Sequence, residues 1–287
     1  MNKEQSKLFQ RALRELVAPA LVVDGSLGPA SLEALRKYAV LMHFENPKDL
    51  QSGQAVDAVV RYINVRFITD EHFENCSKRL NVPQSYIRAV AEVESAQSGF
   101  LKDGRVAILF ERHWFYKKLR AALISENVQK RVMSILKVSI DPNDTMDIRA
   151  VKLLGMVSAR FSNVCSAVRG GYMGGEHEYS RLEIAERLDP ESAYQAASYG
   201  RFQIMGFNCT LAGYNDAREM LLSYARGESE QLNSLASFVI ADKRLHTALQ
   251  KGDWANVARI YNGPAYKENN YDTRLATAQK KYTSYDK

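Results

Sequence analysis

A carboxyl group at the end of an apolar helix face is the first feature of this sequence that could do chemistry. In residues 84–94, Ile87, Val90 and Ala91 recur at helical spacing, and Glu94 completes the same face one turn later. Burial disfavours the charged form of a carboxyl group, and so does the negative end of a helix dipole. Both effects predict a raised pKa for Glu94. A side chain that still holds its proton near neutral pH can act as a general acid.

The residues that follow offer two kinds of partner for this acid. Residues 99–110 predict a β-hairpin, because Asp103 and the glycine after it form a strong turn signal. Asp103 lies at the tip of this hairpin, and Glu111 lies at the exit of its second strand. Glycosidases ordinarily use two carboxyl groups that flank the bond, so Glu111 is the candidate second group. The alternative is structural, with Glu94 buried as the ion-pair partner of an arginine, for instance Arg112.

Residues 197–206 mix small, aromatic and amide side chains, a combination typical of a sugar-binding cleft. Ser198 and Gly200 would let a saccharide approach the backbone closely. Tyr199 is a candidate for stacking on a sugar ring, and Gln203 is a candidate for hydrogen bonds to its hydroxyl or acetamido groups. The alternative is that the aromatic residues of this segment belong to the core.

A second segment with the same mixture lies near the C-terminus. Residues 254–264 contain Tyr261 and Asn262, followed by a Gly-Pro pair. We expect these two side chains to bind the same substrate as the preceding segment. The alternative is that Asn262 and the residues after it only form a turn.

The helical pattern predicts two domains and a mainly α fold. Three short amphipathic stretches in residues 1–66 predict a small three-helix bundle. A break falls near residues 64–69, where Thr69 can cap a new helix that begins with two acidic residues. Residues 67–287 then predict a larger α-helical domain that contains the short β-hairpin.

Composition excludes several other classes of protein. The net charge of +6 is spread along the chain, with no Lys/Arg tract and no zinc-finger spacing, so we expect no nucleic acid as a partner. Scattered histidines and three cysteines at unrelated spacings predict reduced thiols, no metal and no cofactor. No apolar run reaches the ~18 residues that span a bilayer, so we expect no stable membrane insertion. The polar N-terminus predicts no signal peptide.

Four ordered motifs together resemble a phage-type N-acetylmuramidase family with a goose-type lysozyme or lytic transglycosylase fold. They are RAVAEVES at 88–95, GF at 99–100 with DGR at 103–105 and ILFERH at 108–113, SYGRFQIMGFN at 198–208, and YNGP at 261–264. The resemblance runs from about Thr69 to the C-terminus. It implies that Glu94 is the catalytic acid, with Glu111 as the less certain second carboxylate. Tyr199 departs from the pattern, because many relatives are expected to carry Trp there.

The N-terminal segment resembles a peptidoglycan-binding module of the three-helix type. The matching stretches are LFQRAL at 8–13 and VDGSLGPAS at 23–31, followed by the helix to residue 42. This resemblance implies that Asp24, Gly25 and Gly28 contact the cell wall. The alternative is that Asp24 and the glycines serve the turn itself, since turn aspartates usually bond their own backbone.

We therefore expect a monomeric, modular endolysin that hydrolyses the β-1,4 bond between N-acetylmuramic acid and N-acetylglucosamine, with Glu94 as the general acid. The host cytoplasm would hold it until release to the cell wall. The first alternative is a lytic transglycosylase, which shares the fold and the acid but leaves anhydromuramic ends. The second is a non-catalytic peptidoglycan-binding or virion structural protein.

Overall fold

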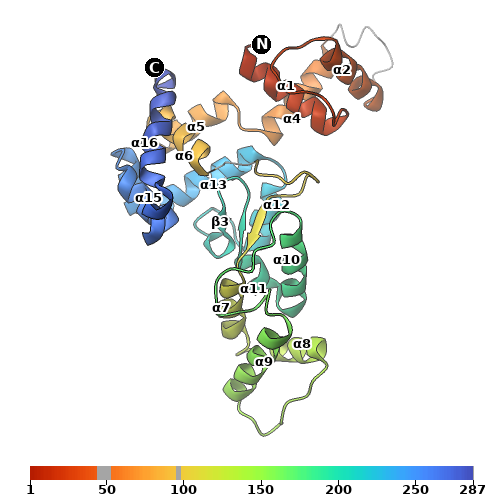
Figure 1. Cartoon of the computed structure of the whole chain (residues 1–287), viewed down its shortest axis with the longest axis vertical. Helices are drawn as coiled ribbons and strands as arrows, with labels where there is room; N and C mark the ends of the chain where they lie inside the picture. The colour runs from red at the N-terminus through yellow and green to blue at the C-terminus, as the bar shows by residue number, and fades with distance from the viewer. Residues whose placement is uncertain (44–52, 95–97, 287) are drawn as a thin grey trace. The chain divides into compact units, whose positions relative to one another are not determined.

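A computed structural model of the chain describes residues 1–43, 53–94 and 98–286. The chain forms two compact units and is mainly α-helical (Figure 1). The first unit comprises residues 1–72 with residues 226–229, and the second comprises residues 73–225 and 230–287. Ser95, the last residue of the first motif, lies outside the described residues.

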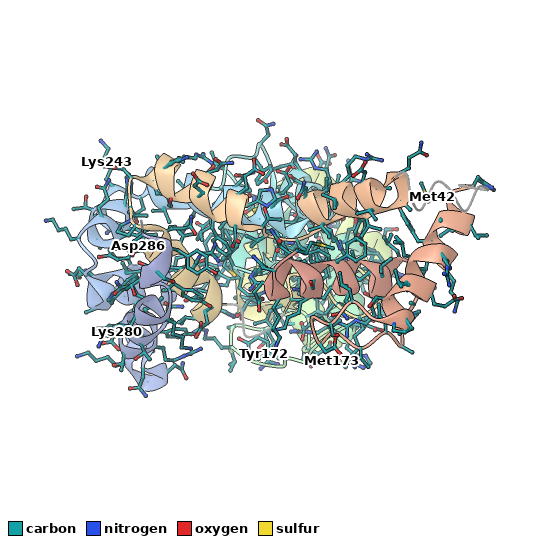
Figure 2. The ribbon with its side chains drawn as sticks, turned by 90° about the horizontal axis from the view of Figure 1, so that it is seen from above. Met42, Tyr172, Met173, Lys243, Lys280 and Asp286 are labelled. Carbon is teal, nitrogen blue, oxygen red and sulfur yellow. The ribbon has the colours of Figure 1, made fainter. Side chains whose placement is uncertain are left out.

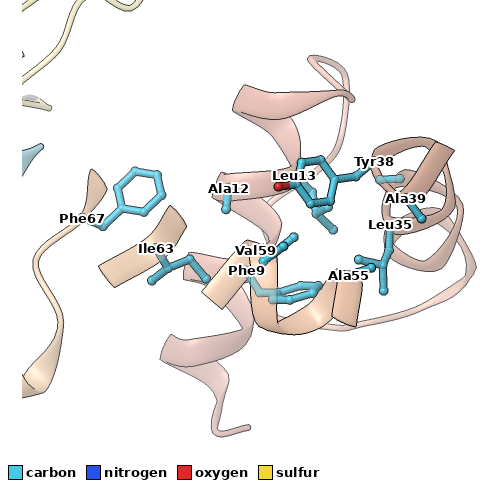
Figure 3. Close-up of a cluster of buried hydrophobic side chains, with 12 residues drawn as sticks. Phe9, Ala12, Leu13, Leu35, Tyr38, Ala39, Ala55, Val59, Ile63 and Phe67 are labelled. Carbon is cyan, nitrogen blue, oxygen red and sulfur yellow. The ribbon is translucent and has the colours of Figure 1, made fainter. Parts of the chain in front are cut away.

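The N-terminal unit is built from three helices with one shared core. They are α1 (Lys3–Leu16), α2 (Pro29–Leu41) and α4 (Gln54–Arg66). Asn2 begins α1 with a reciprocal capping box, and a proline occupies the first turn of α2. Each helix contributes side chains to a buried apolar cluster that includes Leu13, Leu35 and Val59 (Figure 3). The periodicity therefore predicted a real bundle, because its apolar stripes meet in a single core.

The second unit surrounds a small sheet with helices. In chain order these helices are α5 (Asp70–Leu80), α6 (Gln84–Glu94), α7 (Arg112–Ala122), α8 (Glu126–Leu136), α9 (Met146–Arg160), α10 (His177–Leu188), α11 (Pro190–Gln195), α12 (Ala217–Tyr224), α13 (Glu228–Ala241), α14 (Lys243–Gln250), α15 (Trp254–Asn262) and α16 (Tyr271–Lys281). Both α5 and α13 cross between the two units. Short 3-10 helices lie at Gly206–Asn208, Pro264–Asn269 and Thr283–Tyr285. No helix in the described parts of the chain is long and apolar enough to span a bilayer.

The sheet joins segments that are far apart in the sequence. It has three antiparallel strands in the order β1 (Ile108–Phe110), β2 (Ala197–Tyr199) and β3 (Ile204–Met205). Leu109 pairs with Ser198, which in turn pairs with Met205. The sheet therefore brings the end of the predicted hairpin beside the predicted sugar-binding segment.

The hairpin predicted for residues 99–110 is shorter than expected. Phe100 and Val106 form a single bridge, and Asp103 closes the turn by accepting hydrogen bonds from the backbone and side chain of Arg105. Ala107 still donates a hydrogen bond to the backbone oxygen of Gly99, and from Ile108 the chain forms β1, which pairs with β2. The tight hairpin within the sheet is instead β2–β3, which the sequence analysis did not predict.

A buried ion pair ties the sheet to α10. The Glu178 and Arg181 side chains are almost wholly buried, and Arg181 Nη1 lies 2.6 Å from Glu178 Oε2. Glu178 also accepts hydrogen bonds from the backbone N–H groups of Phe110, Met173 and Gly174. These bonds hold the loop before α10 against β1, because a buried charge is stable only when it is fully paired.

Candidate active site

Glu94 is the last residue of α6 and lies where α6 meets the helices α13 to α16. The apolar face of α6 is buried as predicted, through Ile87, Val90 and Ala91. The half-buried Glu94 side chain helps to line a small cavity. Its other lining residues are mostly aliphatic and come from α6, α13, α14, α15 and α16. The carboxyl group therefore sits among apolar side chains, as the helix periodicity predicted.

The surroundings of Glu94 favour its protonated form. Burial raises the pKa of Glu94. A hydrogen bond from Asn262 and the positive charge of Arg274 lower it in part, and the net shift is upward. A carboxyl group with a raised pKa keeps its proton at higher pH, which is the property that a general acid needs.

Asn262 is the side chain that contacts Glu94 directly. It is the last residue of α15, and its Nδ2 donates a hydrogen bond to Glu94 Oε1 over 3.0 Å. Its Oδ1 is buried and has no hydrogen-bond partner among the described residues. Gly263 follows with φ +86°, a conformation that suits glycine and lets the chain leave the helix at this point. Asn262 therefore has one polar atom on the acid and another free for a ligand.

Tyr261 links this site to the β2–β3 hairpin. Its hydroxyl donates a 2.8 Å hydrogen bond to the backbone oxygen of Phe202, and its ring makes an edge contact with Phe238. Burial strongly raises the pKa of Tyr261. These contacts hold α15 to the hairpin, so Tyr261 helps to place the neighbouring Asn262.

The β2–β3 hairpin carries Ser198 and Gln203 as a bonded pair. Ser198 Oγ donates to Gln203 Oε1 over 2.7 Å, and Gln203 Nε2 donates to the backbone oxygen of Gly200 over 2.8 Å. Gln203 has φ +48° and is exposed, whereas Ser198 is buried. Of the two side chains, only that of Gln203 is thus placed to meet a substrate.

Two expectations for this hairpin do not fit the structure. Tyr199 is wholly buried and its hydroxyl donates to the backbone oxygen of Tyr194, so its ring has no face on which a sugar could stack. Gly200 is required by packing rather than by a saccharide. It has φ +69°, and a Cβ atom there would lie 2.6 Å from Gln231 Oε1 and 2.8 Å from Tyr224 Cδ2.

Glu111 occupies a different environment from Glu94. It directly precedes α7 and is buried, and its carboxylate accepts hydrogen bonds from the Tyr172 hydroxyl at 2.9 and 3.0 Å. His113 Nδ1 lies 3.1 Å from Glu111 Oε2, and burial lowers the pKa of His113 despite this carboxylate. Tyr172 and its exposed neighbour Met173 lie side by side at the edge of the view in Figure 2.

The ion pair between Glu94 and Arg112, the example given for the structural alternative, is absent from the described residues. The Arg112 guanidinium instead donates to the backbone oxygens of Ser162, Val168 and Arg169. It therefore organises the loop after α9. The positive charge that acts on Glu94 belongs to Arg274, which the sequence analysis missed.

The predicted wall-binding residues form the turn before α2. Asp24 Oδ1 accepts hydrogen bonds from Gln10 Nε2 and the Ser26 N–H, and Gln10 Oε1 accepts from the Asp24 and Gly25 N–H groups. Gly25 has φ +83°, whereas Gly28 directly precedes α2 and has open space around it. Asp24 and Gly25 thus serve the turn, which is the structural alternative for them.

The described residues include no group of three or more metal-ligating side chains. All three cysteines are buried and unpaired, as expected for reduced thiols. Burial raises the pKa of Cys76 to about 12 and that of Cys165 to about 11. These thiols therefore behave as small core residues.

Comparison with known proteins places this site in a family. The N-acetylmuramidase family model matches residues 83–283, a span that contains Glu94, Glu111, the β2–β3 hairpin and Asn262. The structure is similar to the crystal structure of Burkholderia AP3 phage endolysin, with 31% sequence identity and a TM-score of 0.62. That match covers 96% of this chain and 86% of the other. No curated protein matches the chain significantly. The chain belongs to the N-acetylmuramidase family of peptidoglycan-degrading glycosidases.

Proposed function

We propose that the chain cleaves the β-1,4 bond between N-acetylmuramic acid and N-acetylglucosamine, with Glu94 as the general acid. The environment of its carboxyl group carries this proposal. Glu94 is half-buried among apolar side chains, bonded to Asn262 and shifted toward its protonated form. It lies within the residues that match the N-acetylmuramidase family.

In this proposal Glu94 protonates the glycosidic oxygen while positive charge develops on the sugar that is cleaved. Asn262 orients the acid through Nδ2 and offers Oδ1 to a hydroxyl or acetamido N–H of the sugar. Gln203, exposed at the β2–β3 turn, binds a neighbouring polar group of the glycan. A water molecule then attacks the oxocarbenium-like centre and completes hydrolysis.

We infer that Glu111 has a structural role and does not take part directly in the chemistry. Its carboxylate accepts hydrogen bonds from the Tyr172 hydroxyl and lies 3.1 Å from His113 Nδ1. Among the described residues, the groups that contact Glu111 are distinct from those that contact Glu94. Activation of the attacking water then falls to backbone groups of the cleft.

At the level of the cell, we propose a modular endolysin. The similar Burkholderia AP3 phage protein is described as an endolysin, and the match spans nearly this whole chain. The N-terminal three-helix unit would bind the wall and raise the local concentration of substrate. The host cytoplasm would hold a monomeric enzyme until release, and the positive net charge would favour the anionic wall.

The test is lysis of purified peptidoglycan by the full chain and its Glu94→Gln variant. We expect Glu94→Gln to lose at least about 100-fold in rate, because general acid catalysis contributes 10²–10⁴-fold. Glu74→Gln is the matched control, since it removes an exposed carboxylate that pairs with Lys78 on α5. Near wild-type lysis by Glu94→Gln would refute this assignment. Wall sedimentation without lysis by the wild-type chain would favour a non-catalytic binding protein.

A further inference from the structure

The C-terminal end of α6 is held by a side chain from the last long helix. Arg274 of α16 donates a hydrogen bond from Nη2 to the backbone oxygen of Val93 over 3.1 Å. The last four carbonyl groups of a helix have no partner within it, and Val93 supplies one of these in α6. Since Val93 directly precedes Glu94, this bond fixes the backbone from which the acid projects.

The Arg274 guanidinium is itself held in place by an aromatic ring. Its Cζ lies 5.2 Å from the centre of the Tyr271 ring, one turn earlier on α16. This distance is within the range of a cation–π contact. Arg274 is exposed, so these contacts, rather than burial, determine where its charge lies.

Asn262 of α15 and Arg274 of α16 act on the Glu94 carboxyl. Tyr261 of α15 and Tyr271 of α16 lie close enough for the charge of Glu94 to act on them. Burial raises the pKa values of Tyr261 and Tyr271, and the negative charge of Glu94 raises them further. Both tyrosines therefore stay neutral at any pH near neutrality. Among the described groups, Arg274 is the cation that acts on Glu94.

We propose that Arg274 is a positioning residue for the general acid, binding the Val93 carbonyl, contacting Tyr271 and holding a positive charge near Glu94. This inference rests on the proposed role of Glu94. It gives α16 a role in catalysis, although none of the sequence motifs includes this helix. Arg274 fixes the direction of the carboxyl group and sets the pH above which that group loses its proton.

The sign of the pH effect follows from the charge. A nearby cation favours the carboxylate, so Arg274 lowers the pKa of Glu94 against the effect of burial. Without the cation, the carboxyl group stays protonated to higher pH. The alkaline limb of the rate profile, where activity falls as the acid ionises, then moves to higher pH. The maximal rate falls at the same time, because the acid is less well oriented.

The experiment compares pH profiles of kcat for three variants of the full chain on soluble glycan strands. Arg274→Gln removes the charge, and Arg274→Lys keeps it without the planar guanidinium. Lys280→Gln removes a charge from an exposed position of the same helix (Figure 2) and is the matched control. Thermal unfolding of each variant shows whether it is folded at the assay temperature.

We expect Arg274→Gln to lower the maximal kcat about tenfold and to move the alkaline limb to higher pH. Arg274→Lys restores the position of the limb, and Lys280→Gln matches the wild type. An unmoved limb in a folded Arg274→Gln variant would overturn the proposal, and so would a limb that Arg274→Lys fails to restore. If Glu94→Gln is active, the proposed function fails instead, so the two failures are distinguishable.

Discussion

At the scale of single residues, the proposed catalysis depends on one carboxyl group that lies where its charged form is unfavourable. Glu94 is held among aliphatic side chains and receives one hydrogen bond, from Asn262. Glu92, two positions earlier, faces outward and contacts Lys281 and Tyr282. Those contacts lower the pKa of Glu92, while burial raises that of Glu94. The pKa values of two carboxyl groups on one helix thus shift in opposite directions because the side chains lie on different faces.

The raised pKa of Glu94 also predicts a cost in stability. Between the unfolded value, near 4.5, and the higher folded value, the folded state keeps a proton that the unfolded state releases. Wild-type stability therefore falls as pH rises through this window and stays lower above it. We expect Glu94→Gln to unfold at a temperature about 2 °C higher than the wild type at pH 7. Scanning calorimetry at pH 7 and at pH 4 measures both differences.

At pH 4 this difference should largely vanish, because wild-type Glu94 is then mostly protonated in both states. A Glu94→Gln variant that is less stable than the wild type at pH 7 would contradict the account of its burial.

A second residue-scale prediction concerns Glu111. Glu111→Gln keeps an oxygen that can accept the Tyr172 hydrogen bond, so the loop stays in place. We expect this variant to keep more than about a tenth of wild-type kcat, against a loss of at least about 100-fold for Glu94→Gln. Rates on soluble glycan strands measure both. Equal losses would show that Glu111 takes part in the chemistry as the second carboxylate.

At the scale of elements, α6 is fastened at both ends by the C-terminal segment. Near its start, Asp286 accepts a 2.7 Å hydrogen bond from the Ser85 N–H. The Arg88 guanidinium lies 3.8 Å from the centre of the Tyr285 ring and 4.3 Å from that of Phe73. Near its end, Arg274 binds the Val93 carbonyl. The helix that carries the acid is therefore oriented by residues nearly 200 positions away in sequence.

Removal of residues 282–287 should therefore loosen α6. The truncation removes the hydrogen bond at the helix start, the hydrogen bond from the Tyr282 hydroxyl to Glu92, and the contacts of Arg88 with Tyr282 and Tyr285, together worth about 2 kcal/mol. We expect the unfolding temperature of this unit to fall by about 5 °C, and kcat to fall with it. Ser284→Ala, at an exposed position in the same segment, is the control. An unchanged unfolding temperature would show that the segment does not fasten α6.

The sequence predicted some elements of the site and not others. The α6 helix and its acid were predictable, because apolar periodicity is a local signal. The pairing of Leu109 with Ser198 was not, because nothing local links two short strands almost 90 residues apart. Tyr199 pairs with Ile108 in the same sheet and is buried, and no local signal in the sequence distinguished it from an exposed aromatic residue. No sequence motif marked Arg274, because its partner Val93 lies on a helix that is far away in the sequence.

At the scale of the whole molecule, charge and modular organisation govern how the protein meets an insoluble polymer. The net charge of +6 is distributed along the chain. Exposed charges interact over about 10 Å at 0.1 M salt and over much shorter distances at 1 M. We expect sedimentation with purified anionic walls to fall at least several-fold between about 0.05 and 0.5 M salt.

Chitin, an uncharged polymer, is the control surface for this experiment, and salt should change sedimentation with it far less. Sedimentation with walls that is insensitive to salt would show that binding depends on uncharged groups, for instance those of the N-terminal unit.

If this chain is a hydrolase with Glu94 as its general acid, its products must carry reducing N-acetylmuramic acid ends. Mass spectrometry of the soluble products from purified peptidoglycan tests this proposal most directly. The account predicts fragments with hydrated, reducing N-acetylmuramic acid ends from the wild type, and almost none from Glu94→Gln. Anhydromuramic ends, lighter by one water, would show that the muramic 6-hydroxyl attacks and that the enzyme is a transglycosylase. Hydrated ends from both proteins would contradict the role of Glu94.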